Sequence, residues 1–291
     1  MVADVLDRAT DRPAKRLVVH ARNGVLLACG AINTPALLLR SKAGTGSGLV
    51  GKRTFLHPAA PLVAFYDEPV EGFYGAPQSV SVHHFARRTD GVGYFLETSP
   101  THPMLAAIAF PGIGDAHRRV AERLAYVQAT IALMIDGQQD DAGGTVSVDG
   151  AGRIKLRYPI GPALREAAVH ALQSMARLQL AAGAREVMTL HDSPLTIRTE
   201  AEVARIAEAP FGPNLHTLFS AHQMGGCPMG EDSARSVVDS RGRHHELENL
   251  WIVDGSVFPT ALGVNPQLSI YAHARLFATE IASNFKRISP G

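Results

Sequence analysis

The sequence has few cysteines, little net charge and no long apolar run, and each of these absences excludes a class of protein. Its 291 residues include only Cys29 and Cys227, so neither a disulfide framework nor a paired-cysteine zinc site is expected. The net charge of +1 gives no basis for binding nucleic acid or an anionic membrane. The longest apolar candidate, 124–135, contains Gln128 and falls short of the roughly 18 residues of a membrane helix. We expect a cytoplasmic protein with no signal peptide and no integral membrane segment.

Several catalytic motifs are also missing. There is no H-E-x-x-H pattern, and the histidines at 83–84 and 244–245 would point to opposite faces of a strand, so no metal site is expected. There is no G-x-S-x-G motif of a serine hydrolase. One G-x-G-x-x-G pattern occurs at 46–51, but it follows a predicted helix and runs into Lys52. A dinucleotide loop must follow a strand and open a helix, so we expect no pyrophosphate site there.

What is present is typical of a globular protein, with 46 % hydrophobic and 19 % charged residues, enough for a sizeable core. The apolar spacing and turn residues predict the following elements. They are a hairpin over 16–28 with its turn at Asn23-Gly24, a glycine turn and helix from 28 to 40, strands at 61–66, 79–85 and 91–98, a helix over 115–135, a hairpin over 144–158 and a helix over 162–182.

The most informative stretch is 221–274. Leu250–Val253 reads as a buried parallel strand that stops at Asp254-Gly255, where ligands gather in such sheets. Asn265 suits the N-cap of a following helix and Pro266 suits its first position. His222 can take a hydroxyl proton near neutral pH, and we expect the glycines that follow it to let the backbone approach a ligand.

These motifs together resemble the C-terminal signature of the glucose–methanol–choline (GMC) flavoprotein oxidoreductases. The signature comprises His222-Gln-Met-Gly-Gly-Cys, then Asn249-Leu-Trp-Ile-Val-Asp-Gly-Ser, then Gly263-Val-Asn-Pro. The segments 28–41 and 48–58 also resemble this family. The amino-acid sequences around Phe219-Ser-Ala-His222 and through 91–103 are most similar to those of the long-chain fatty alcohol oxidase branch.

The resemblance implies FAD as cofactor and the following roles. The residues are His222 and Asn265 for catalysis, Gly30, Asn33, Thr34, Asp254, Gly255, Asn265 and Pro266 for cofactor binding, and Glu97 for the substrate. A structural histidine in a glycine turn is the alternative for His222. For Glu97, a solvent-exposed strand residue is the commoner situation. Asn265 cannot act as a base, so it would hold the substrate oxygen by a hydrogen bond.

The fold class implied is α/β (α+β), with a partial Rossmann-like FAD-binding domain and an antiparallel-sheet substrate domain with helices on one face. We expect partial FAD-binding segments at 1–59 and 213–291 and the substrate domain at 60–212. The dinucleotide fingerprint of the family has no counterpart in this sequence.

The implied reaction oxidises an alcohol, most consistently a hydrophobic or long-chain one, to a carbonyl, with hydride transfer to flavin N5 and reoxidation by oxygen or another acceptor. Two alternatives remain. The chain could be a truncated, inactive C-terminal half, or one subunit of a split enzyme whose partner supplies the N-terminal half of the FAD domain.

Overall fold

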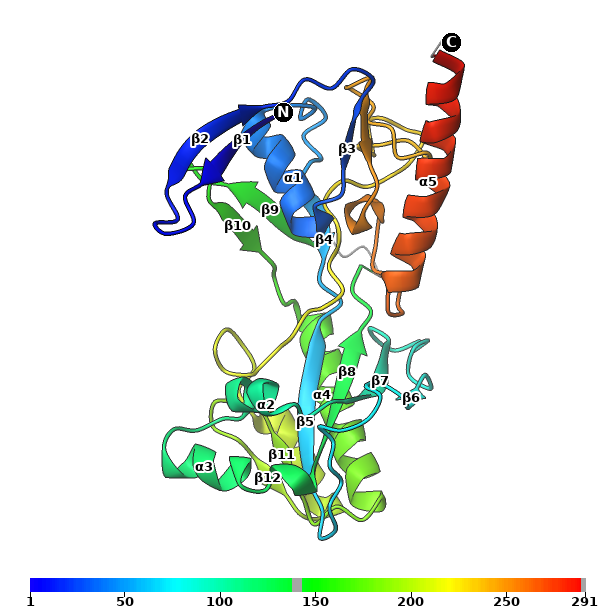
Figure 1. The fold of residues 1–291 in the computed structure, drawn as a ribbon. Coiled ribbons are helices and arrows are strands. Elements are labelled where there is room, and N and C mark those ends of the chain that lie inside the picture. The colour runs from blue at the N-terminus through cyan, green and yellow to red at the C-terminus, as the bar shows by residue number, and fades with distance from the viewer. Residues whose placement is uncertain (138–142, 289–291) are drawn as a thin grey trace.

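The computed structural model describes residues 1–137 and 143–288, which form two lobes (Figure 1). One lobe carries the N-terminus and the C-terminal helix α5 (Gln267–Ile288), and the other is arranged around the long helix α4 (Pro162–Ala181). Proline at the first position suits the start of α4, and Gly183, with a φ of +94°, follows its end. The expected mixed fold class with an antiparallel sheet is confirmed.

The lobe around α4 is built on a six-stranded antiparallel sheet with strand order β12-β11-β5-β8-β7-β6. Its strands are β5 (Ala59–Phe65), β6 (Ser81–Val82), β7 (Tyr94–Ser99), β8 (Val127–Met134), β11 (Glu186–Thr189) and β12 (Thr196–Ile197). Leu172 and Met175 of α4 are buried in one cluster with Leu62 of β5. Because side chains alternate along a strand, Val63 lies in a separate cluster with Ala106 and Phe110.

Short helices complete this lobe. They are α2 (Pro103–Ala109), α3 (Asp115–Ala121) and the 3-10 segments η1 (Leu124–Tyr126) and η2 (Glu200–Glu208). η2 packs beside α4, whereas α2 contributes Ala106 to the cluster that contains Val63. The sheet is therefore covered by a long helix on one face and by α2 on part of the other.

The predicted helix over 115–135 is wrong in its second half. The helix ends at Ala121, and Val127–Met134 forms β8, which pairs along its length with β5 on one side and β7 on the other. Five of the eight residues of β8 are buried and only Gln128 and Thr130 are polar, so this short apolar run does not by itself distinguish a strand from a helix.

The other lobe contains three small sheets. A four-stranded sheet has the order β10-β9-β4-β13, and two pairs, β1-β2 and β14-β3, stand apart from it. The elements are β1 (Val2–Leu6), β2 (Pro13–Val18), β3 (Val25–Leu27), α1 (Gly30–Ser41), β4 (Lys52–Phe55), β9 (Gly144–Val148), β10 (Ile154–Arg157), β13 (Met224–Gly225), β14 (Leu250–Ile252) and η3 (Gly255–Val257). Its core joins Leu27, Leu38, Ile252 and Phe277.

The predicted hairpin over 16–28 is also wrong. β2 pairs with β1, and β3 instead pairs in parallel with β14, with Val25 opposite Leu250. The parallel pair buries Leu27 and Ile252 in one core, and this long-range burial overrides the local Asn23-Gly24 turn signal. The parallel strand predicted near 250–253 is confirmed.

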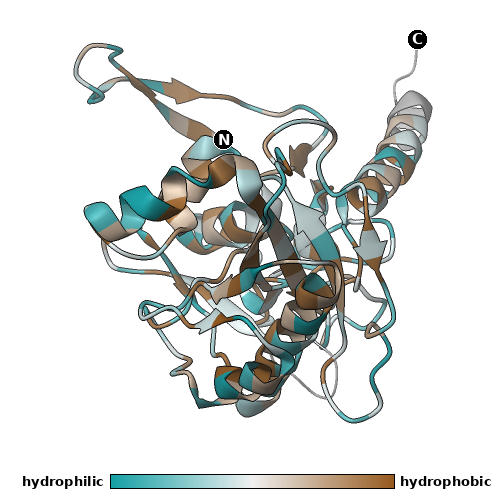
Figure 2. Ribbon diagram, turned by 90° about the horizontal axis from the view of Figure 1, so that it is seen from below, coloured by the Kyte–Doolittle hydropathy of each residue, from teal (hydrophilic) through white to brown (hydrophobic). Residues whose placement is uncertain are grey.

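Apolar side chains remain exposed on the lobe that carries both termini. Figure 2 shows hydrophobic residues recurring along α5, which projects from the body of the molecule. Leu268 is 81 % exposed and Leu276 is 61 % exposed, and Leu26 in the parallel pair is 45 % exposed. Across the described residues, none of the helices combines the length and apolar character needed to cross a bilayer.

The packing of α4 predicts a large difference between two leucines of the same helix. Leu172 is fully buried, so Leu172→Ala should lower the free energy of unfolding by about 2–5 kcal/mol, because it leaves a cavity. Leu178→Ala is the matched control, because Leu178 is 45 % exposed and its loss should cost about 0.5 kcal/mol or less. Urea unfolding followed by the circular dichroism signal of the helices measures both free energies. Equal losses of unfolding free energy in the two variants would contradict this packing.

Candidate active site

His57 and His222 form a hydrogen-bonded pair where the two lobes meet. Their Nδ1 atoms lie 3.0 Å apart and their ring centroids 5.1 Å apart. His57 comes soon after β4 and His222 shortly before β13, and the antiparallel pairing of these strands brings the rings together. His57 is fully buried, whereas His222 is partly exposed. The proton acceptor predicted from the sequence therefore has a second imidazole as its partner.

The backbone at His57 is held by a buried carboxylate. The N–H groups of Leu56 and His57 donate to the two oxygens of Asp136 at 2.8 and 3.0 Å, and the Tyr158 hydroxyl donates to Oδ2 at 2.7 Å. His57 has a φ of +49°, in the left-handed region that few non-glycine residues adopt. Neither His57 nor Asp136 was predicted as a site residue. The His57-Pro58 pair at the end of a family-like segment was the available signal for His57, and nothing in the sequence pointed to Asp136.

Asn265 and Glu97 form a second contact. The Asn265 amide donates to Oε2 of Glu97 over 3.4 Å, which is long for a hydrogen bond. The predicted cap is displaced by one position, because α5 begins at Gln267 and the Ile270 N–H donates to the Pro266 carbonyl at 2.8 Å. Glu97 is only 7 % exposed, so the expectation of a solvent-exposed strand residue is wrong.

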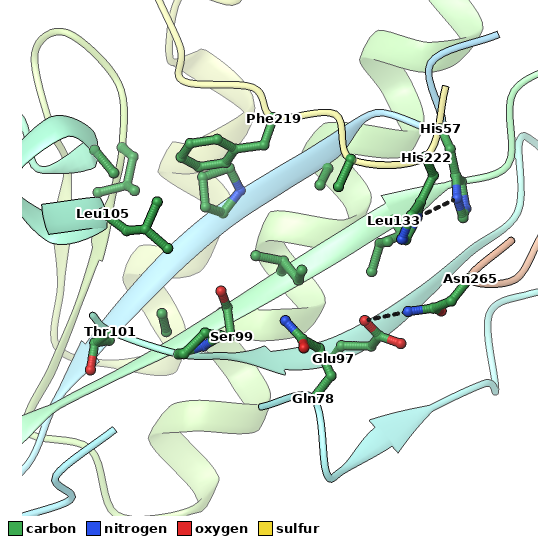
Figure 3. A pocket seen from close by; sticks show the side chains of 18 of the residues that line it. His57, Gln78, Glu97, Ser99, Thr101, Leu105, Leu133, Phe219, His222 and Asn265 are labelled. Atoms are coloured by element: carbon green, nitrogen blue, oxygen red, sulfur yellow. Dashed lines mark hydrogen bonds between the residues drawn. The ribbon is translucent and has the colours of Figure 1, made fainter. Parts of the chain in front are cut away.

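All four side chains line one end of a cavity of about 670 Å³ (Figure 3). Leu105 and Thr101 lie toward its opposite end. Most of the remaining wall is apolar and is contributed by Ala59, Pro61, Val63, Ala106, Ala109, Phe110, Ala129, Ile131, Leu133, Leu190, Phe219 and Ile270. A mostly apolar space that has ionisable groups at one end, with Gln78, Ser99 and Thr101 elsewhere in its wall, suits a ligand that has an alkyl body and a polar head.

Burial sets the protonation states at the polar end. Burial, together with the neighbouring His222, lowers the pKa of His57 to about 3, so this ring is neutral at physiological pH. Burial also lowers the pKa of His222. For Glu97, burial raises the pKa, and the hydrogen bond from Asn265 and the nearby His83 partly oppose it. Neutral imidazoles are the form that can accept a proton.

Three of the predicted cofactor residues meet around one carboxylate. Oδ2 of Asp254 accepts from the Gly30 N–H at 3.0 Å and from the Thr34 hydroxyl at 2.5 Å, and its Oδ1 accepts from the Ser256 N–H at 2.8 Å. Asp254 thus ties the end of β14 to the start of α1. Asn33 is exposed on α1 and lies outside this network.

Gly255 and Pro266 lie near the cavity instead. A Cβ built on Gly255 would meet Ile270 at 3.2 Å, and Pro266 itself lines the cavity. The structure therefore separates the predicted cofactor residues into a carboxylate network at α1 and a group at the start of α5.

The glycines after His222 pack closely against the protein backbone. Gly225 has a φ of +79°, and a Cβ there would lie 2.0 Å from the Arg53 carbonyl oxygen. A Cβ on Gly226 would meet Pro35 at 3.0 Å. These glycines therefore allow close packing against β4 and α1, and their predicted approach to a ligand stays a prediction.

Two backbone N–H groups of the glycine pattern at 46–51 are already bonded to another residue of the protein. The N–H groups of Gly46 and Ser47 donate to the Glu246 carboxylate at 2.8 and 2.7 Å. A phosphate could bind these N–H groups only by displacing the Glu246 carboxylate.

The residues at the carboxyl ends of β3 and β14 fit a nucleotide-type cofactor. Gly30 opens α1 with a φ of +83°, and a Cβ built there would meet no atom within 4 Å. Asp254 accepts from the Gly30 N–H, and Cys29 at the N-cap makes no side-chain capping bond, so the N–H groups that follow Gly30 in the first turn are the ones that suit an anion. Nε2 of His57 is buried without a hydrogen-bond partner among the described residues.

The fold and the site thus combine a hydrogen-bonded histidine pair, a mostly apolar cavity and a helix start beside a parallel strand pair, which is an arrangement suited to a cofactor-dependent oxidoreductase. Sequence models described as GMC oxidoreductase match residues 5–59 and 141–274, and both ranges contribute residues to the cavity lining. The chain belongs to the GMC oxidoreductase family.

Known relatives agree with this assignment. An uncharacterized GMC-type oxidoreductase of Mycobacterium tuberculosis is 36 % identical over 259 residues, which are 89 % of this chain and 39 % of the relative. A long-chain-alcohol oxidase of Arabidopsis thaliana is 26 % identical over 293 residues, covering 94 % of this chain and 37 % of the plant enzyme. The chain therefore spans less than half the length of these relatives.

A solved structure supports the same fold. The formate oxidase of Aspergillus oryzae, described in a study of FAD modification, has a TM-score of 0.65 at 16 % identity. The match covers 98 % of this chain and 58 % of the oxidase.

The raised pKa of Glu97 predicts a pH-dependent effect of Glu97→Gln. The pKa of Glu97 in the folded protein lies above the ordinary value of 4.5. Ionisation of Glu97 therefore opposes folding, and the contribution of this residue to the free energy of unfolding falls as pH rises through its folded pKa. The stability of Glu97→Gln relative to the wild type should therefore increase from pH 4 toward pH 7. Urea unfolding at several pH values measures this difference, and a difference that stays constant or falls over that range would contradict it.

Proposed function

We propose that this chain provides the catalytic and substrate-binding parts of an FAD-dependent enzyme that oxidises a hydrophobic, long-chain alcohol to a carbonyl compound. The observation that carries the proposal is the polar cluster of His222, Asn265 and Glu97 at one end of an apolar cavity. In this proposal, residues 1–59 and 213–291 serve the cofactor and residues 60–212 serve the substrate. The similarity to a long-chain-alcohol oxidase supports the substrate class.

The proposed chemistry divides the work between the cofactor and the protein. When bound, FAD supplies the acceptor for the carbon-bound hydrogen, which leaves as hydride to N5, and oxygen or another acceptor restores the oxidised cofactor. His222 takes the hydroxyl proton, since its lowered pKa keeps the ring in the neutral form that can accept one. The Asn265 amide has two N–H groups, so it can contact Glu97 with one and hold the substrate oxygen with the other.

The protein also controls orientation and water. The apolar wall from Phe219 to Leu105 holds the alkyl chain, and the burial of this chain favours binding by roughly 0.8 kcal/mol for each methylene group. The residues that would hold FAD are those at the start of α1 beside Gly30, which suit its phosphates, and Pro266 at the start of α5.

The acid–base role predicts a specific loss on removing the imidazole. His222→Ala in the FAD-loaded protein should lower kcat for long-chain alcohols by about 10²- to 10⁴-fold, the usual contribution of a general base. Leu178→Ala is the control, because Leu178 is 45 % exposed on α4 and lies outside the cavity lining. Steady-state turnover of decanol and glucose tests both points. Turnover of glucose but not decanol by the wild type would refute the substrate class, and unchanged kcat in His222→Ala would refute the base.

A second proposal concerns what completes the cofactor lobe. Parallel sheets are normally buried on both faces, yet the β3-β14 pair has only two strands and Leu26 is exposed. Leu268, Tyr271 and Leu276 on α5 add exposed apolar surface. We propose that these surfaces bind further FAD-domain polypeptide, either in the same protein or from a partner chain.

This second proposal predicts that FAD binding depends on added polypeptide. The purified chain should retain little FAD after desalting, whereas co-expression with the N-terminal FAD-domain segment of a GMC relative should restore an oxidised-flavin band in the visible spectrum. Leu26→Asp should weaken that restoration, with Leu178→Asp as the control on an exposed site of the other lobe. Stoichiometric FAD on the chain alone would contradict the proposal.

A further inference from the structure

The ring of His57 is hydrogen-bonded to His222. Its Nδ1 lies 3.0 Å from Nδ1 of His222, and no other hydrogen bond of its ring is found among the described residues, because its buried Nε2 has no partner there. Two Nδ1 atoms at this distance need one proton between them, so one ring donates and the other accepts. The direction of this bond decides which nitrogen of His222 carries a lone pair.

Only one direction leaves His222 able to act as a base toward the cavity. If His57 donated, neutral His222 would accept at Nδ1 and carry its proton on Nε2, so it would have no free lone pair for a substrate proton. If His222 donates from Nδ1, its Nε2 is the unprotonated nitrogen. That nitrogen can take a proton without any change in the bond to His57, since the imidazolium also donates from Nδ1.

We propose that His57 is a positioning residue that accepts a hydrogen bond from Nδ1 of His222, and thereby fixes the tautomer in which Nε2 of His222 is the proton acceptor. The inference rests on the proposed function for its catalytic meaning. Its structural content, the direction of one hydrogen bond, does not depend on turnover.

The surroundings of His57 fix the position of its ring and keep the ring neutral, as a hydrogen-bond acceptor requires. Both backbone N–H donors to Asp136 fix the chain at Leu56 and His57, and the ring packs against Phe95 with centroids 5.5 Å apart. Full burial and the neighbouring His222 keep the pKa of His57 near 3, so a proton added to the pair resides on His222.

The other titratable groups near the pair are known. Glu97 and Tyr271 line the same cavity, Asp136 and Tyr158 lie on the backbone side of His57, and His83 stacks on Phe95 with centroids 5.1 Å apart. All of them stay unchanged in the variants below, so a shift in the titration of His222 reports the bond to position 57.

Two substitutions of similar size separate acceptance from packing. His57→Asn keeps an acceptor oxygen on a short side chain, and asparagine tolerates a positive φ. His57→Leu fills the space without an acceptor. Nitrogen-15 NMR of histidine-labelled protein reports the tautomer and the pKa of His222 in the chain itself, with His222→Gln identifying its signals.

The wild type and His57→Asn should hold the proton on Nδ1 of His222, with Nε2 unprotonated. In His57→Leu the Nε2-protonated tautomer should appear, and the pKa of His222 should fall, because the imidazolium loses its acceptor. In the FAD-loaded protein, kcat/KM should fall on the order of 10- to 100-fold in His57→Leu, the range for groups that orient a functional histidine, and less in His57→Asn. The acid limb of its pH profile should move to lower pH in the leucine variant alone.

A wild-type His222 protonated on Nε2, or identical titrations in the three proteins, would overturn the inference. If His57→Leu fails to fold, the tautomer in the wild type still decides the direction of the bond. Absence of alcohol oxidation with the expected tautomer would instead count against the proposed function alone.

Discussion

The site depends on the antiparallel pairing of the two segments that connect the lobes. β4 continues through His57 into β5, and the returning segment pairs with it twice, at β13 and at the Ala59–Phe219 bridge. The Ser220 hydroxyl adds a bond to the Leu56 carbonyl at 2.5 Å. Because both histidines lie between these contacts, the register that joins the lobes also sets the distance between the two rings. A slip of one residue would turn each side chain to the opposite face.

Burial then gives the two rings different properties. His57 is enclosed by Phe95 and the backbone bonded to Asp136, so its charged form is strongly disfavoured. His222 opens onto the cavity, so it is the ring that can exchange a proton with a ligand. Asn265 and Glu97 come from a third and a fourth part of the chain, and this end of the cavity is therefore assembled only when the lobes and α5 are in place.

Local signals predicted much of the fold, and long-range pairing accounts for most of the errors. The β9-β10 hairpin, α4 and β14 carry their own turns, caps and apolar runs, and each was predicted near its observed position. β8 and the β3-β14 pair depend on partners far away in the sequence, and no local pattern reveals them. The family motifs gave His222, Asn265 and Asp254, whereas the contact of His222 with His57 joins positions 165 residues apart.

The two ends of the cavity are formed by different elements, and this affects how the cavity can change by mutation. The polar end is built from the connecting segments, β7 and the start of α5, all of which are tied to the rest of the fold. The far end is closed in part by α2, a helix of seven residues whose Met104 and Ile108 face solvent. Mutations in that one helix can lengthen, shorten or reshape the space without disturbing the contact between His57 and His222. Under the proposed function, substrate range is thus open to evolutionary drift or laboratory redesign, while the end that holds the histidines remains under constraint.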